Sequence, residues 1–167
     1  MTYDIYFVRP QTGRTLLQTL EAANAEFDLD AEPEPMRLTP EQRAAWDRIA
    51  QRVSRELGPA SCEEFLYTLS LRREGPEGIV QLDYSGISAY IHIPYLYPGR
   101  LALPVLTEAY RIAIVTEQET GLAGYDPQAD QPTACGDLAL AAGQLGQTAL
   151  WVQENLARRP STAAEDA

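Results

Sequence analysis

The chain carries a single histidine, His92, within a segment that alternates isoleucine with other residues (Ile91-His92-Ile93). If the isoleucines face a core, His92 faces the opposite side of the strand, where it can act as a general base or as a proton-dependent contact. Asp4 and Asp83 lie in two other predicted strands, and an aspartate cluster with His92 can hold Mg²⁺ or Mn²⁺. A half-exposed histidine without a chemical role is the alternative.

Tyrosines gather around this histidine along the chain. Tyr90, Tyr95 and Tyr97 flank His92, and tyrosine is enriched at interfaces because it joins an apolar ring to a polar hydroxyl. They predict a binding surface or, alternatively, the rim of a core.

Asp126 and Gln128 lie at the end of a later predicted strand, in Asp126-Pro127-Gln128. Strand ends often contact ligands, although aspartate before proline also simply starts turns.

Most sequence signatures of enzymes are missing. The chain contains no GxGxxG, Walker, HExxH or GxSxG motif, and all of its basic residues are arginine, so there is no lysine for a Schiff base. Cys62 and Cys135, together with one histidine, are too few for a cysteine-based zinc site, and we expect them to be reduced, small core residues. The sequence therefore favours a protein without catalytic residues, cofactor or metal.

The net charge is −11, with 24 acidic and 13 basic residues. Such a chain repels nucleic-acid backbones and anionic membranes, so neither is an expected partner. An acidic segment without basic residues, 26–35, can steer a basic protein partner, or it is merely a solvated loop. Its acidic side chains are Glu26, Asp28, Asp30, Glu32 and Glu34.

The elements that must position these residues can be read from hydrophobic spacing. Alternation predicts strands at residues 2–8, 64–71, 79–84, 87–95 and 122–125. Helical spacing predicts helices at residues 15–27, 40–57, 101–119 and 136–158, with Thr39 and Gln42 forming a capping box on the second. The order β-α-α-β-β-β-α-β-α indicates an α+β, two-layer sandwich, in which helices cover one mostly antiparallel sheet of about five strands. Because a helix precedes the last strand, we expect that strand to lie parallel to one neighbour.

The length suits one domain, residues 1–158, followed by a disordered tail at 159–167. The N-terminus lacks the apolar region of a signal peptide, and no run of about 18 apolar residues is present. A cytoplasmic location without membrane association is therefore expected.

Three short pieces carry a resemblance to a group of small, mostly uncharacterised bacterial proteins. These are YDIYF at residues 3–7, IHIPYLYPG at 91–99 and ETGLAGYDPQ at 119–128. Some proteins of this kind resemble immunity proteins, which neutralise a toxin by binding it. The resemblance implies a binding function and brings no catalytic residue.

Three hypotheses follow. The preferred one is a non-enzymatic, immunity-like protein-binding module with an acidic, tyrosine-bearing surface. The second is a small enzyme or a ligand- or metal-binding domain that uses His92, Asp126 and the tyrosines. The third is a homodimer joined through the amphipathic C-terminal helix.

Overall fold

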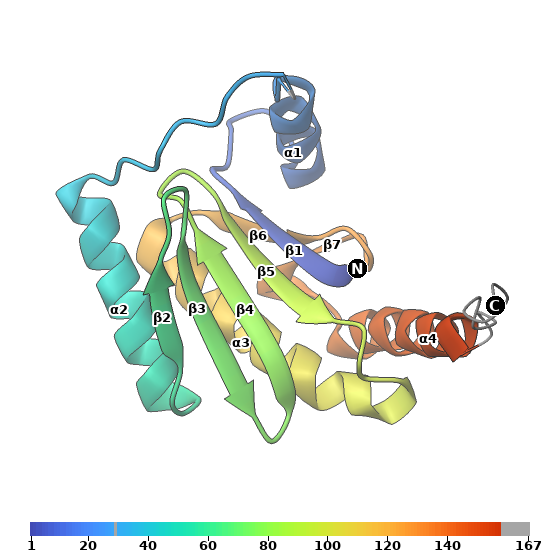
Figure 1. Cartoon of the computed structure of the whole chain (residues 1–167). Coiled ribbons are helices and arrows are strands. Elements are labelled where there is room, and N and C mark those ends of the chain that lie inside the picture. Colours follow the sequence, from blue (N-terminus) through green and yellow to red (C-terminus); the bar gives the residue numbers. More distant parts are fainter. Residues whose placement is uncertain (29, 158–167) are drawn as a thin grey trace, which may run out of the picture.

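The computed structural model describes residues 1–28 and 30–157 and has the α+β class predicted from the sequence (Figure 1). A seven-stranded sheet is ordered β2-β3-β4-β5-β1-β6-β7, and every neighbouring pair is antiparallel. Its strands are β1 (Thr2–Val8), β2 (Ser61–Glu64), β3 (Leu69–Gly75), β4 (Gly78–Tyr84), β5 (Ala89–Pro94), β6 (Ala123–Asp126) and β7 (Gln131–Pro132).

The predictions of about five strands and of one strand over residues 64–71 were wrong. That segment spans the end of β2, a tight turn and the start of β3. The Phe65 N–H donates to the Thr68 carbonyl at 2.8 Å and closes the turn. Apolar residues continue through the turn, so alternation alone cannot reveal the reversal.

The predicted parallel neighbour of the last long strand was also wrong. Strands β5 and β6 both pair antiparallel with β1. They therefore run in the same direction, as a helical crossover favours, but β1 lies between them. Strand β1, which precedes both of its partners along the chain, therefore occupies an interior place in the sheet.

Alternation along the strands separates a buried face from an open face. Tyr3, Ile5 and Phe7 of β1 are buried, whereas the residues between them are half-buried. The same holds for Ile91 and Ile93 of β5, as their spacing predicted. His92 and its polar neighbours consequently lie on the open face.

Four α-helices accompany the sheet: α1 (Leu16–Ala25), α2 (Pro40–Glu56), α3 (Ala102–Thr120) and α4 (Leu138–Ala157). Short 3₁₀ turns, η1 (Gly99–Leu101) and η2 (Thr133–Cys135), precede α3 and α4. The predicted capping box of Thr39 and Gln42 is present on α2, and an equivalent box of Thr15 and Gln18 begins α1. Gly121 ends α3 with φ of 72°, a conformation that favours glycine.

Helix α3 packs against the buried face, with α2 on one side of it and α4 on the other (Figure 1). Helix α1 lies apart from them, near the end of the sheet where β1 finishes (Figure 1). Among the described residues, no helix has both the length and the hydropathy needed to cross a membrane. The predicted tail, residues 159–167, lies outside the described residues.

Contrary to the expectation from the sequence, neither cysteine is a core residue. Cys62 in edge strand β2 and Cys135 in η2 are both exposed, with free thiols. In an edge strand one face of the backbone is easily left uncovered, so a small apolar residue there need not be buried.

Candidate functional site

Three of the strand residues singled out from the sequence meet on the open face. Strand pairing places His92 directly opposite Asp4, and Asp83 reaches the same ring from β4. His92 Nδ1 lies 2.7 Å from Asp4 Oδ1, and His92 Nε2 lies 3.3 Å from Asp83 Oδ2. The imidazole thus bridges two carboxylates across three adjacent strands.

Neighbouring side chains hold both carboxylates in place. The Thr2 hydroxyl donates to Asp4 Oδ1 at 2.7 Å, and the Ser70 hydroxyl donates to Asp83 Oδ1 at the same distance. The Gln81 amide donates to Asp83 at 3.0 Å. The result is a continuous polar row, which we call the His92 row, made of Thr2, Asp4, His92, Asp83, Gln81 and Ser70.

The charges in this row reinforce one another. Hydrogen bonds to Asp4 and then to Asp83 raise the pKa of His92 from its ordinary 6.5 to about 9, against the opposing effect of partial burial. Partial burial also disfavours ionisation of both aspartates. The hydrogen bonds from His92 and its neighbours outweigh it, and the pKa of each carboxyl is lowered. At neutral pH the row is an imidazolium between two carboxylates.

This arrangement has a direct chemical consequence. An imidazolium has no free lone pair, and both N–H groups of His92 face carboxylates. It cannot accept a proton as a general base at neutral pH. Within residues 1–28 and 30–157, no group of three or more His, Cys, Asp and Glu side chains is arranged to hold a metal ion.

Tyrosines extend the open face beside the row. The Tyr90 ring stacks near His92, with ring centroids 6.3 Å apart, and Tyr6 meets Tyr90 edge-on at 5.5 Å. Tyr95 is half-buried against the core, and the Tyr97 hydroxyl accepts the Ile79 N–H at 2.7 Å. Of the three tyrosines predicted to bind, only Tyr90 is an exposed member of the open face.

Asp126 and Gln128 lie elsewhere. Asp126 is fully buried on the other face of the sheet, where the hydroxyls of Tyr3 and Tyr110 each donate to its Oδ2 at 2.6 Å. Its Oδ1 accepts the backbone N–H groups of Gln128 and Ala129. Burial and the nearby carboxylate raise the pKa of Tyr3 and Tyr110, which keeps both phenols protonated as donors. Asp126 therefore serves the core and does not converge with His92.

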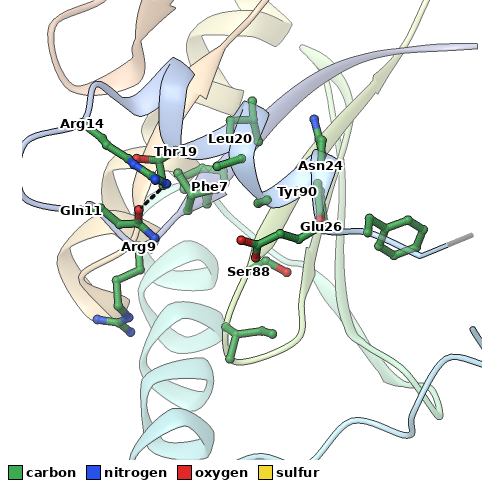
Figure 2. A pocket seen from close by; sticks show the side chains of 15 residues that line it. Phe7, Arg9, Gln11, Arg14, Thr19, Leu20, Asn24, Glu26, Ser88 and Tyr90 are labelled. Carbon is green, nitrogen blue, oxygen red and sulfur yellow. Dashed lines mark hydrogen bonds between the residues drawn. The ribbon is translucent and has the colours of Figure 1, made fainter.

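A groove of about 420 Å³ lies between α1 and the sheet, close to Tyr90 (Figure 2). Phe7 and Leu20 contribute apolar surface to it, and Phe27 and Ile87 stand at its rim, 70% and 76% exposed. Its polar lining includes Arg14, Gln11, Glu26 and Ser88. We call this feature the α1 groove.

Local sequence explains the rim of the groove. The β4–β5 connection is a tight turn, closed by the Ser85 N–H donating to the Ser88 carbonyl at 3.0 Å, with Gly86 at φ of 92°. The turn lifts Ile87 away from the sheet. Phe27 follows α1 directly, at the start of the acidic segment. The sequence pattern did not predict Phe27 or Ile87 as binding residues. An isoleucine inside a Ser-Gly-Ile-Ser turn is the signal that could have found Ile87.

The predicted acidic segment begins at this groove. Glu26 lines the groove, and the segment then runs from α1 toward α2 (Figure 1). Its remaining acidic residues, Asp28, Asp30, Glu32 and Glu34, are exposed. An apolar rim and a run of carboxylates are thus neighbours at one end of the molecule.

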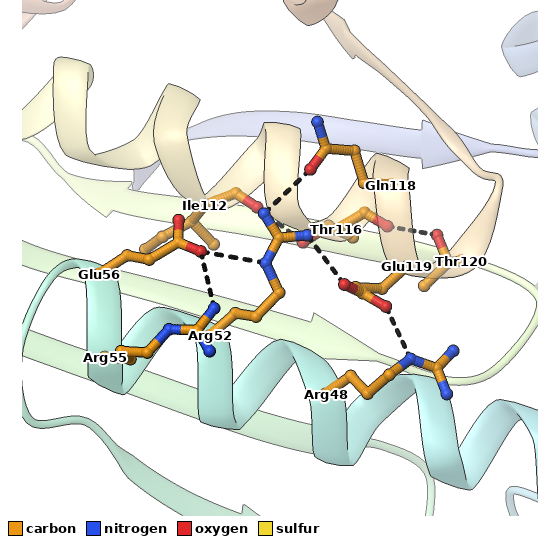
Figure 3. A network of polar contacts seen from close by, with 9 residues as sticks. All are labelled: Arg48, Arg52, Arg55, Glu56, Ile112, Thr116, Gln118, Glu119 and Thr120. Atoms are coloured by element: carbon orange, nitrogen blue, oxygen red, sulfur yellow. Dashed lines mark hydrogen bonds and ion pairs between the residues drawn. The ribbon is translucent and has the colours of Figure 1, made fainter.

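Two other polar clusters are structural. Arg52 of α2 lies 2.8 Å from Glu119 of α3 and 3.1 Å from Glu56, and Arg48 also reaches Glu119 (Figure 3). These ion pairs tie α2 to α3. Arg73 of β3 is buried beside Glu108 at 2.9 Å and donates to the Leu57 and Pro59 carbonyls. The sequence pattern did not predict the Arg73–Glu108 pair, because hydrophobic spacing alone assigns no charged residue to the core.

Comparison of the chain with protein-family models, with curated proteins and with solved structures finds no match.

Proposed function

We propose that this chain is a non-enzymatic protein-binding module whose contact surface is the rim of the α1 groove and the adjoining open face. The observation that carries the proposal is the exposure of Phe27, Ile87 and Tyr90 around a groove that continues into an acidic segment. Aromatic and aliphatic anchors next to a pocket are typical of the residues that dominate binding energy at protein interfaces.

The charge distribution supports a basic partner. The molecule carries −11 overall, and the acidic segment stands beside the groove without a basic residue before Arg37. Such a field accelerates encounter with a positively charged surface, and salt weakens the effect. The apolar rim then supplies the short-range contacts. Long-range attraction by the acidic segment and short-range contacts by the apolar rim together fit an immunity-like role, in which the chain binds a basic protein and neutralises it.

The His92 row supports binding rather than catalysis. Its imidazolium has no free lone pair at neutral pH, and its aspartates are committed to hydrogen bonds. A fixed row of charges and hydroxyls beside Tyr90 can orient a partner without changing any covalent bond.

The test compares matched variants of the immobilised chain in lysate of its native host. Ile87→Ser alters the groove rim, whereas Leu150→Ser alters an exposed leucine on α4, far along the chain from the groove. We expect a basic protein to be retained by the wild type and by Leu150→Ser, and to be lost from Ile87→Ser and at high salt. Equal retention by both variants, or no retained protein, would contradict the proposal.

A second candidate function is the binding of a small apolar molecule in the same groove. The volume of about 420 Å³ favours it, because small-molecule sites commonly occupy about 300–1,000 Å³. A thermal-shift screen with metabolites and divalent metals tests it, with Leu20→Trp as the variant that fills the groove. A ligand that raises the melting temperature of the wild type but not of Leu20→Trp would support this function. Unchanged melting across the screen would count against it.

A further inference from the structure

Helix α4 presents an unusual outer surface, distant in sequence from the α1 groove. It packs against α3 and η1 through small and aliphatic residues, namely Ala141, Ala142, Leu145, Gly146 and Ala149. The opposite side exposes Leu140, Leu150 and Trp151, at 47%, 48% and 58%. In Figure 1 the helix extends away from the sheet, and the exposed fractions of these three side chains show that this side is open.

The helix contributes no charge to this outer surface, and Arg100 of η1 is the charged residue beside it. Between residues 138 and 153 the helix contains no acidic or basic side chain, in a chain of which 22% is charged. Exposed apolar surface of this kind is uncommon on a helix that faces only water, and it marks an interaction site.

A groove of about 380 Å³ runs beside the exposed leucines. Its floor is made of small residues, including Ala142, Gly143 and Gly146, and Leu103 of α3 forms part of its wall. Gly146 is required here, because a Cβ at this position would lie 2.7 Å from the Gly99 carbonyl oxygen. The close approach of η1 to α4 therefore creates the groove.

We propose that this surface binds a second copy of the chain through antiparallel packing of two α4 helices. The outer face carries the small residues Ala139 and Gly143 beside Leu140 in its first half, and the large residues Leu150 and Trp151 in its second half. In an antiparallel pair, Leu150 and Trp151 of each helix meet the half of the other that carries Ala139, Leu140 and Gly143. A two-fold axis near residue 146 makes both contacts at once, as an isologous interface demands.

Electrostatics favours a second copy over other occupants. Two molecules of charge −11 repel each other, and a surface that carries Arg100 but no carboxylate along residues 138–153 allows them to approach without placing carboxylates opposite carboxylates. A basic partner would find no counter-charge along residues 138–153. A basic partner instead fits the acidic segment beside the α1 groove. The α1 groove and the outer face of α4 therefore have different occupants.

Sedimentation velocity over a range of protein concentrations tests the proposal. We expect the wild type to change from monomer to dimer as concentration rises into the micromolar range. Leu150→Glu places an unpaired carboxylate in the apolar contact with the facing helix and should weaken association by about tenfold or more. Gln147→Glu tests the same idea at an exposed groove residue, where misfolding is not expected, and should also weaken it. Ile87→Glu, at the α1 groove, should dimerise as the wild type does. A monomer at every concentration would overturn the proposal, as would dimerisation of both α4 variants as strong as that of the wild type.

Tryptophan emission gives an independent readout. Trp46 is buried and stacked on Tyr84, whereas Trp151 is exposed. Dimerisation should shift the emission of Trp151 to shorter wavelength as concentration rises, and Trp151→Phe should remove that shift. Added salt should strengthen the dimer by screening repulsion, whereas it weakens binding of a basic partner. A concentration-independent emission spectrum would contradict the assignment of Trp151 to the interface.

Discussion

At the scale of the residue, the His92 row is an electrostatic clamp across β1, β5 and β4. Each of its hydrogen bonds joins an ionised group, and such bonds are stronger than neutral ones. The clamp is half-exposed, which limits its contribution to stability. Its contribution to the free energy of unfolding should nevertheless be measurable, because it depends on the titration of His92 and the sequence contains no other histidine.

We predict that the contribution of His92 to the free energy of unfolding falls between pH 6.5 and pH 9. Its pKa is about 9 when folded and 6.5 ordinarily, so in this range the folded state binds more protons. The stabilisation is therefore complete below pH 6.5 and is lost as the pH rises through 9.

Urea unfolding of the wild type and His92→Gln at several pH values checks this. The variant should be less stable by about 1 kcal/mol at pH 6, with the gap closing toward pH 10. NMR titration of the wild-type imidazole should have its midpoint near pH 9. A midpoint near 6.5 would show that the two carboxylates do not hold the ring.

Asp126 leads to a second prediction at this scale. Tyr3→Phe removes one donor from a fully buried carboxylate and should lower the free energy of unfolding by about 1–3 kcal/mol. Tyr6→Phe is the matched control on the same strand, since the Tyr6 hydroxyl makes no hydrogen bond with another described residue. Its stability should stay within about 0.5 kcal/mol of the wild type in urea unfolding. Similar losses in both variants would contradict the role given to Asp126.

At the scale of the element, helices α1 and α2 begin with the same type of capping box but bury very different numbers of side chains. Helix α2 buries Ala45, Trp46, Ile49 and Val53, whereas α1 buries only Thr19 and Leu20. A helix with few buried side chains can open locally without unfolding the rest. The identical capping boxes therefore allow the two helices to be compared directly.

We predict that Thr39→Ala lowers the global free energy of unfolding by about 1 kcal/mol, as loss of an N-cap commonly does. Thr15→Ala should lower it less, because α1 contributes little to the core. Instead, amide hydrogen exchange should show faster exchange within α1. Equal global destabilisation by both variants would mean that α1 is as firmly attached as α2.

The sequence predicted the helices well for a physical reason. Thr39-Pro40-Glu41-Gln42 and Gly121 specify helix ends through local hydrogen bonds and backbone conformation, which need no tertiary partner. The turn at Phe65–Thr68 and the pairing of β1 with β6 depend on distant contacts, so alternation could not reveal them. In the same way, the sequence places His92, Asp4, Asp83 and Asp126 on strands, but only strand register shows that Asp4 and Asp83 meet His92 and that Asp126 does not.

At the scale of the whole molecule, β1 joins the two parts of the sheet. It pairs with β5 on one side and with β6 on the other, and its inward residues are fully buried. We predict that Ile5→Ala lowers the free energy of unfolding by about 2–5 kcal/mol through lost burial and a cavity. Val8→Ala, at the half-buried end of the same strand, should cost distinctly less. Denaturant unfolding followed by circular dichroism checks both, and comparable losses would contradict a central role for Ile5.

The position of β1 has a consequence during synthesis of the protein. Residues 2–8 leave the ribosome well before their partners, because β5 and β6 are not made until residues 89–94 and 123–126. Until then the nascent segment TYDIYFV has both hydrogen-bonding edges unsatisfied and is prone to pair with other extended chains. Asp4 within that segment supplies a charge that discourages such pairing, before it becomes a partner of His92 in the finished fold.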